Sequence, residues 1–350
     1  MLRKALLAAL VVTLCASSPL WAGKPGLGQN GDFNGWLPFT PNSPWNKDIS
    51  AEPVDPLSGS IVALMGVNTS LHPDFGTTWG IPYYVVSGSQ RKVKVTNTAY
   101  QTESDNLMMP LPPTGLIEGN GAGDAHFLVL DRDNYLIYEL YHTSRTDNGR
   151  KYSCGGCAIF NGNSSTLRPN YWTSSDAAGM SVLAGLVRYQ EVYVDKVIKH
   201  AIRCQSDYTR KAFLPPATHW ASSYTGTQYP PMGCRFRLKA SFNTAGYSGG
   251  AKVIVEALKK YGMIMSDNGG MWFITGAGPD SRWNDPEINT LKNVHGRDFE
   301  VVKMNGLVAA SAAPALSPIA PTPTLTQTLE ATTKPAATSA PSGFWRSPPK

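Results

Sequence analysis

The chain has 350 residues, and most of its formal net charge of +6 lies outside the segment that we expect to fold. Arg3 and Lys4 account for +2, and residues 307–350 contribute a further +2, which leaves +2 for residues 23–306. So small an excess over so long a segment does not indicate a nucleic-acid partner, and we expect none.

The first 22 residues have the pattern of an export signal. Arg3 and Lys4 precede an apolar run over residues 5–14, and small residues lead to a cleavage site after Ala22. The run is too short to span a bilayer, and no other stretch reaches the roughly 20 apolar residues that a spanning helix needs. We therefore expect a secreted, extracellular or periplasmic monomer without a membrane span in the mature chain.

Alternating apolar and polar residues, separated by Gly, Pro and Asn, are more frequent than helical patterns. They predict strands at 81–86, 91–96, 126–131, 135–142, 197–204, 234–242 and 271–275. Two helices are predicted, one from Ser175 or Asp176 to Leu183 and one at 251–261. The pattern predicts a mainly β fold, an antiparallel β-sandwich or jelly-roll-like single domain over residues 23–306 with about two packed helices.

Residues 307–350 differ sharply in composition from the rest. Pro, Ser, Thr and Ala make up 30 of these 44 residues, and such a segment cannot bury enough apolar surface to offset the entropy of ordering it. We expect a disordered tail of the kind found in secreted enzymes that act on insoluble polymers. A disordered terminus without a role is the alternative.

Four cysteines remain after the expected cleavage. An even number in an exported protein predicts disulfides, which we assign as Cys154–Cys157 and Cys204–Cys234. A four-cysteine zinc site is a weaker alternative, because the second half of the set lacks a CxxC spacing. A redox-active CxxC is disfavoured, because no helical pattern follows Cys157. We predict no metal and no cofactor. A metal site formed by His72, His126 and His219 is a weaker alternative, because the three residues lack the spacing of a metal-binding motif.

The strongest candidate for chemistry is the predicted hairpin over residues 124–142. A turn at residues 131–134 would place His126 opposite Glu139 and Asp124 opposite Tyr141. These four side chains would share one face with Leu128, Leu130 and Ile137. A carboxylate beside an imidazole suits general acid–base work, and an Asp–His or Glu–His bond that only fixes the hairpin end is the alternative.

The predicted Cys204–Cys234 bridge would make the strands at 197–204 and 234–242 neighbours. His200 would then lie on an apolar face, as a core histidine or a catalytic one. The opposite face would carry five cations, which are Lys199, Arg203, Arg235, Arg237 and Lys239. They either pair with acidic side chains or form a positively charged surface, a cationic floor, that binds an acidic glycan.

Other candidates rest on residue type and neighbours. Glu118 and Asp267 could supply further carboxylates for catalysis. Aromatic rings beside polar side chains are typical of sugar-binding surfaces, although most such rings in β-rich domains pack in the core. The remaining substrate-binding candidates are Trp172, Arg188, Tyr189, His219, Trp220, Asn268 and Trp283.

Several long blocks resemble a family of largely uncharacterised secreted bacterial and fungal proteins, some of them joined to carbohydrate-binding modules. The resemblance covers about residues 42–302. It implies an extracellular life among polysaccharides and brings no established catalytic residue; family members usually have a larger polar residue at the position of Ala125. The blocks are LHPDFGT (71–77), IEGNGAGDAHFLVLD (117–131), YELY (138–141), LRPNYWTSSDAAGMSVLAGLVRYQEV (167–192), HAIR (200–203), PPMGCRFRLKASF (230–242) and YGMIMSDNGGMWFITG (261–276).

Two functions are compatible with these features. The first is a secreted carbohydrate-active enzyme that cleaves glycosidic bonds, as a hydrolase using two carboxylates or as a lyase on a uronate glycan using His126 or Tyr141 as the base. The second is a non-catalytic glycan-binding or wall-associated protein. The chain lacks GxSxG, HExxH and phosphate-loop motifs, and a Ser-His-Asp triad assembled across the fold remains open.

Overall fold

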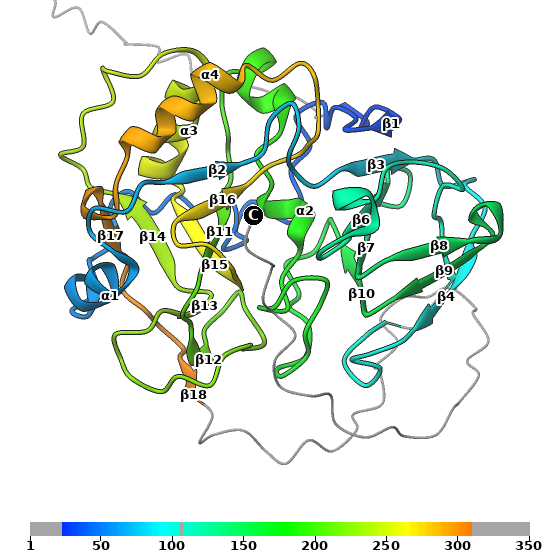
Figure 1. The fold of residues 1–350 in the computed structure, drawn as a ribbon, viewed down its shortest axis with the longest axis horizontal. Coiled ribbons are helices and arrows are strands. Elements are labelled where there is room, and N and C mark those ends of the chain that lie inside the picture. The colour runs from blue at the N-terminus through cyan, green and yellow to red at the C-terminus, as the bar shows by residue number, and fades with distance from the viewer. Residues whose placement is uncertain (1–22, 106–107, 310–350) are drawn as a thin grey trace, which may run out of the picture.

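The computed structural model describes residues 23–105 and 108–309, and strands outnumber helices in this part of the chain. The mainly β fold predicted from the sequence is confirmed. Figure 1 shows the strands in two groups, with the short helix α2 (Val182–Gly185) between them. The predicted export signal at residues 1–22 lies outside the described residues, and so does the predicted tail from residue 310 onward.

The first group is a sandwich of two sheets. Its five-stranded sheet has the order β1-β3-β6-β7-β10, and these strands are β1 (Gly28–Gln29), β3 (Tyr83–Val86), β6 (Phe127–Asp131), β7 (Leu136–Tyr141) and β10 (Gly156–Asn161). A four-stranded sheet packs on one face in the order β5-β4-β9-β8, made of β5 (Met108–Met109), β4 (Val93–Asn97), β9 (Lys151–Cys154) and β8 (Ser144–Thr146). Because both faces of the five-stranded sheet are covered, β6 and β7 are buried along their whole length.

The second group is built on a six-stranded sheet with the order β17-β14-β15-β11-β16-β2. Its strands are β17 (Phe299–Val301), β14 (Arg235–Leu238), β15 (Met263–Asn268), β11 (Ile202–Ser206), β16 (Phe273–Thr275) and β2 (His72–Asp74). A small sheet of β13 (Pro231–Met232), β12 (Arg210–Phe213) and β18 (Val308–Ala309) lies beside it. The pairing of β18 with β12 brings the first residues of the predicted tail into the fold.

The predicted helix at 251–261 is confirmed as α3 (Gly249–Lys260), whose apolar stripe packs in the core of the second group. The other predicted helix is much shorter than expected. Ser181 is its N-cap and only α2 is helical, while residues 176–181 form a loop. The remaining helical segments are α1 (Ser58–Met65), η1 (Glu118–Gly121), η2 (Asp147–Gly149), η3 (Gln190–Val194), α4 (Asp285–Ile288), η4 (Asn289–Asn293) and η5 (Gly296–Asp298).

The hairpin of β6 and β7 forms, but its predicted register is wrong by two residues. Leu128 lies opposite Glu139, and Asp131 lies opposite Leu136. The loop is longer than assumed because Asp131 Oδ1 accepts hydrogen bonds from the backbone N–H groups of residues 133 and 134, and Tyr135 takes a left-handed φ of 53°. A shift of two preserves which side chains share a face, so Leu128 and Ile137 do lie in one apolar cluster as expected.

The two predicted disulfides have different outcomes. Cys154 and Cys157 are bonded, as predicted. The predicted Cys204–Cys234 bridge is wrong, since both are buried free thiols. The cause is the sheet order: β15 lies between β11 and β14, so the two cysteines flank Met265 from opposite sides.

Thiol labelling tests this cysteine assignment. We expect no labelling of the native protein, because Cys204 and Cys234 are buried and burial raises the pKa of both thiols. After denaturation without reductant, both should be labelled, and peptide mapping should recover Cys154 joined to Cys157. Recovery of a peptide that joins Cys204 to Cys234 would contradict the sheet order.

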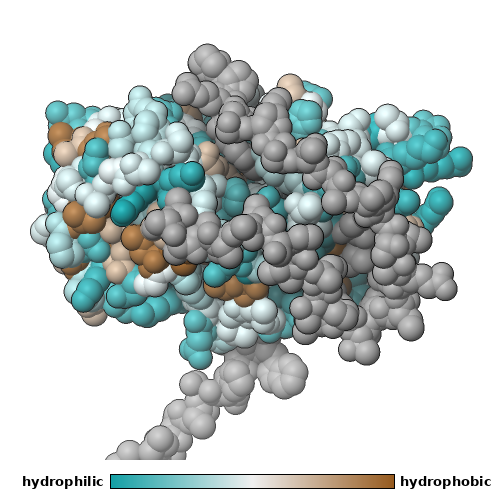
Figure 2. Space-filling model, turned by 90° about the horizontal axis from the view of Figure 1, so that it is seen from below, coloured by the Kyte–Doolittle hydropathy of each residue, from teal (hydrophilic) through white to brown (hydrophobic). Residues whose placement is uncertain are grey.

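Figure 2 shows a face on which hydrophilic residues predominate and hydrophobic ones form small separate patches. Within residues 23–105 and 108–309, no helix has both the length and the apolar character needed to cross a bilayer.

Candidate functional site

Charged side chains from both strand groups meet near α2. Glu118 lies in η1, Asp124 and His126 lie in the segment that leads into β6, and Arg203 and Asp267 lie on β11 and β15. Together with Asp176 from the loop before α2, they form what we call the junction cluster. The pKa of Asp267 responds to Asp124, His126, Asp176 and Arg203, and that of Glu118 responds to His126 and Arg203, so each member lies within electrostatic range of others in the set.

His126 is a buried cation held by two acceptors. Its Nδ1 lies 2.6 Å from Glu118 Oε2 and its Nε2 lies 2.9 Å from the carbonyl oxygen of Ser175. A carbonyl oxygen only accepts, so Nε2 carries a proton, and the ionised Glu118 accepts from Nδ1. Burial opposes the charged imidazole, but the charge and hydrogen bonds of Glu118 outweigh it and raise the pKa of His126 to about 9. His126 is therefore unsuited to act as a base near neutral pH.

Glu118 reaches His126 because the chain turns tightly before β6. The backbone N–H of Glu118 donates to the carbonyl oxygen of His126, and the N–H of His126 donates to Glu118 Oε2. Between them, Gly119 and Asn120 take left-handed φ values of 58° and 57°, which Gly and Asn adopt most readily. The pairing of Glu118 with His126 is thus fixed by local backbone structure.

Arg203 is buried between two carboxylates. Its Nη2 donates to Asp176 Oδ2 at 3.0 Å and to Asp267 Oδ2 at 3.3 Å, and its Nη1 donates to Thr275 Oγ1. One guanidinium cannot fully compensate two buried carboxylates. Burial and the neighbouring Asp176 raise the pKa of Asp267 well above its usual range, despite Arg203. Burial and the neighbouring Asp176 therefore favour the protonated form of Asp267.

Asp124 is more accessible than Asp267. It is half-buried, whereas Asp267 is only 3% exposed. Its charge helps to raise the pKa of His126, and because this interaction is mutual, the imidazolium favours negative charge on Asp124. The next residue, Ala125, is buried with a left-handed φ of 46°, an uncommon conformation for a residue with a side chain. Asp267, whose pKa is raised, thus lies within electrostatic range of the half-buried Asp124.

Tyr141, also predicted to be catalytic, adjoins this pair. Its ring centroid lies 6.0 Å from that of His126. Burial, together with the nearby Asp124 and Asp267, raises the pKa of Tyr141. The phenol is therefore suited to donate a hydrogen bond and unsuited to remove a proton.

Glu139 is sealed in the core, so its predicted catalytic role is not supported. It has no exposed surface, and each carboxylate oxygen accepts from one serine hydroxyl and one backbone N–H group at the start of α2. Its link to His126 is indirect, since Ser175 donates to Glu139 through Oγ and accepts from His126 through its carbonyl oxygen. The predicted alternative, a direct Asp–His or Glu–His bond at this end of the hairpin, does not involve Glu139 either, because the carboxylate bonded to His126 is that of Glu118.

His200 and Arg188 also belong to the core. His200 is 1% exposed; its Nε2 lies 2.8 Å from Arg188 Nη2 and 3.2 Å from Glu191 Oε2, while its Nδ1 donates to the carbonyl oxygen of Ala201. Arg188 also stacks on Phe33, with its guanidinium 4.5 Å from the ring centroid. The interpretation of His200 as a satisfied core histidine is favoured.

The predicted cationic floor does not form, because β11 and β14 are not neighbours. Arg203 belongs to the junction cluster, and Arg237 pairs with Glu300 at 2.8 Å. Arg235 donates to backbone carbonyl oxygens of residues 44, 47 and 261, and Lys239 donates to that of Arg297. These cations have separate local partners.

The aromatic candidates are divided between core and surface. Trp283 is buried and donates to the carbonyl oxygen of Ala277, and Tyr189 lies under the guanidinium of Arg282. Trp172 and Trp220 are half-buried, and Trp220 stacks on His219. Asn268, next to Asp267, accepts a hydrogen bond from Thr209 at 2.6 Å. Trp172 and Trp220 thus remain the tryptophan candidates that are not fully buried.

Sequence reasoning missed Asp176 and Glu103, which lie in loops without periodic pattern. Glu103 Oε2 accepts from the N–H of Thr173 and lies 3.8 Å from His219 Nε2. His219 Nδ1 donates to the carbonyl oxygen of Ala177, and burial lowers the pKa of His219. Glu103 and His219 therefore flank residues 173–177, which also supply Asp176 to the junction cluster and the Ser175 carbonyl oxygen to His126.

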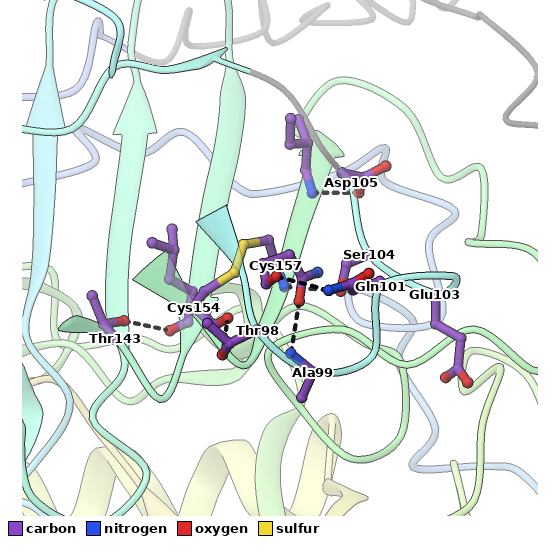
Figure 3. The surroundings of a disulfide bond; sticks show 12 residues. Thr98, Ala99, Gln101, Glu103, Ser104, Asp105, Thr143, Cys154 and Cys157 are labelled. Atoms are coloured by element: carbon purple, nitrogen blue, oxygen red, sulfur yellow. Dashed lines mark hydrogen bonds between the residues drawn. A yellow bond between two sulfur atoms is a disulfide. The ribbon is translucent and has the colours of Figure 1, made fainter. Parts of the chain in front are cut away.

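The Cys154–Cys157 disulfide holds the loop that carries Glu103. Figure 3 shows the bridge beside residues 98–105, with the Glu103 side chain pointing away from it. The backbone N–H of Thr98 donates to the carbonyl oxygen of Cys154, and the backbone N–H of Asp105 donates to the carbonyl oxygen of Cys157. The N–H of Cys157 in turn donates to Ser104 Oγ. The loop that carries Glu103 is thus hydrogen-bonded to both cysteines of the bridge.

Two hollows in the described surface lie away from the junction cluster, since neither is lined by Glu118, Asp124, His126 or Asp267. Within the described ranges, no group of three His, Cys, Asp or Glu side chains has an arrangement that could hold a metal ion, so His72, His126 and His219 do not combine. His72 instead stacks on Phe273. Comparisons with protein-family models, with curated proteins and with solved structures found no match to this chain.

The His126–Glu118 pair predicts a pH-dependent stability. Because the folded protein raises the pKa of His126 from 6.5 to about 9, the pair stabilises the fold fully below pH 6.5 and loses this effect as the pH rises through 9. The expected loss in the free energy of unfolding is on the order of 3 kcal/mol. Urea unfolding at pH 6, 7.5 and 9 measures it, and in Glu118→Gln the dependence should largely disappear. An equal dependence in that variant would contradict the assignment.

Proposed function

We propose that the protein is a secreted carbohydrate-active enzyme that hydrolyses glycosidic bonds of an extracellular polysaccharide at the junction cluster. One observation carries the proposal: Asp267, whose protonated form is favoured by burial and by Asp176, lies within electrostatic range of Asp124, a half-buried carboxylate beside the His126 cation. Glycoside hydrolysis requires one carboxylic acid to protonate the leaving oxygen and one carboxylate to act as base or nucleophile.

Each residue of the cluster has a proposed role. Asp267 donates a proton to the glycosidic oxygen, and Asp124 activates water or attacks the anomeric carbon. His126, fixed by Glu118, stabilises the charged form of Asp124, and Arg203 positions Asp267. The half-buried Trp172 and Trp220 are the proposed stacking surface for sugar rings.

Hydrolysis is favoured over elimination by the state of the candidate bases. A lyase reaction would require His126 or Tyr141 to remove a proton, and both have raised pKa values in their hydrogen-bonded or buried positions. A cation is a poor base, and so is a neutral phenol with a raised pKa. Hydrolysis by Asp124 and Asp267 does not require either of these groups to act as a base.

A polysaccharide panel tests the proposal. The purified mature protein is incubated with neutral and acidic glycans, and reducing ends and the absorbance of unsaturated products are measured together. New reducing ends without unsaturated products are expected. Unsaturated products would assign the reaction to elimination, and saturable binding without any product would assign the protein to the non-catalytic glycan-binding class.

A further inference from the structure

A second candidate site lies on the α3 side of the molecule, apart from the junction cluster. A hollow of about 560 Å³ opens between α3, residues 196–198, β14 and residues 48–50. This volume is within the range of small-molecule binding pockets. None of the proposed catalytic residues lines this hollow, which we call the α3 groove.

The α3 groove has an excess of positive charge. Its lining contains five cations and two acidic side chains, a difference of +3, and Glu300 pairs with Arg237 from outside the lining and reduces the excess to +2. The cations are Lys196, Arg237, Lys252, Lys259 and Lys260, and the acids are Asp48 and Glu256. This small region alone matches the whole net charge of residues 23–306.

The positive charge of two of these lysines is only weakly compensated by acidic side chains. Lys259 Nζ donates to the carbonyl oxygens of Ala240 and Phe242, both at 2.9 Å, and such neutral acceptors satisfy hydrogen bonds without cancelling the charge. Lys260 lies 3.8 Å from Asp48, with both side chains about half exposed, so water screens this pair. Lys196 stands at the rim as an exposed residue.

The groove also offers apolar surface. Val197 is 42% exposed, and the half-buried Tyr261 ring lies under the Lys260 ammonium at 5.4 Å. Sugar rings pack their C–H faces on such surfaces, while lysines attract carboxylates. Cations beside an aromatic ring and an aliphatic side chain therefore fit a carbohydrate that carries carboxylate groups.

We propose that the α3 groove binds a segment of an acidic, uronate-containing polysaccharide and anchors it to the enzyme away from the catalytic cluster. The choice of a glycan over another polyanion rests on the proposed function. A nucleic acid is disfavoured because the folded segment has little excess charge outside this groove. The groove thus assigns the substrate of the proposed enzyme to the acidic polysaccharides.

The test compares two double variants with equal net charge. Lys196→Glu/Lys260→Glu reverses charge at the rim of the groove, and Lys94→Glu/Lys292→Glu makes the same change at exposed positions on β4 and η4. Binding of polygalacturonate is measured by calorimetry at low salt, with dextran as the neutral glycan and polyphosphate as the non-carbohydrate polyanion. We expect about tenfold weaker polygalacturonate binding in the groove variant, equivalent to about 1.4 kcal/mol, and less than a twofold change in the control.

Other outcomes overturn the inference: no binding of polygalacturonate by the unmodified protein, equal weakening in both variants, or tighter binding of polyphosphate than of polygalacturonate. Asp267→Asn separates this inference from the proposed function, since it should bind polygalacturonate normally while losing turnover. If groove binding fails but the enzyme turns over a neutral glycan, only the inference falls. If groove binding holds and no glycan is cleaved, only the proposed function falls.

Discussion

Asp267→Asn is expected to lower the rate of glycan cleavage by about 10²- to 10⁴-fold, the contribution typical of a positioned general acid. Burial beside Asp176 favours the protonated form of Asp267, so asparagine replaces a neutral group with another of similar shape and should leave the fold intact. Asp124→Asn should cause a loss of the same order, because it removes the base or nucleophile. Initial rates of reducing-end release on the cleaved glycan measure both effects.

Asp147→Asn is a matched control for these variants. Asp147 is exposed, lies away from the cluster in η2 and has a left-handed φ of 52°, which asparagine adopts readily. This variant should keep full activity. If Asp267→Asn remained folded and kept more than half of the unmodified rate, the proposed acid would be wrong.

The pH profile provides a second measurement on Asp267. Its proton is needed for catalysis and its pKa is raised, so activity should persist above the pH at which an ordinary aspartate ionises and fall as the pH rises through the raised pKa. In Asp267→Asn, the residual activity should lack this descending limb. A descending limb unchanged in that variant would assign it to another group.

The sequence predicted local elements well because their patterns are short. Alternation located β3, β6 and β7, and a stripe of apolar residues with a following glycine located α3. β15 was missed because both of its faces are buried, so its residues MIMSDN do not alternate. The Cys204–Cys234 bridge was assigned from the even number of cysteines, and without β15 nothing contradicted the strand pairing that it implied. The strands that became β11 and β14 were therefore taken as neighbours, and the predicted cationic floor followed from that error.

The candidate site was predicted in part for the same reason. Asp124, His126 and Glu118 lie within one short segment, and all three belong to the junction cluster. Asp267 was named from its residue type, whereas Asp176 enters through a loop whose path depends on tertiary packing. Glu139 was misassigned because alternation fixes which face a side chain occupies but cannot show what packs against that face.

Glu139→Ala is expected to destabilise the protein strongly, by at least about 3 kcal/mol in the free energy of unfolding. Truncation leaves two serine hydroxyls and the N–H groups of Val182 and Leu183 without the acceptor that they have in the core, and each unsatisfied buried group costs about 1–3 kcal/mol. The stability of Glu139→Gln should lie between that of the alanine variant and that of the unmodified protein. The amide keeps one oxygen acceptor, but its NH₂ group faces the other pair of donors.

Urea unfolding of both variants measures this effect, with Glu256→Ala as the control for loss of a carboxylate at an exposed position of α3. The control should unfold near the midpoint of the unmodified protein, because an exposed ion pair such as Lys252–Glu256 contributes little. A Glu139→Ala protein that unfolded normally but lost all turnover would contradict the structural role and return Glu139 to the catalytic set. If activity is lost only in proportion to the loss of folded protein, Glu139 has a structural role. Its carboxylate then holds the start of α2 in place and, through Ser175, also positions the carbonyl oxygen that accepts from His126.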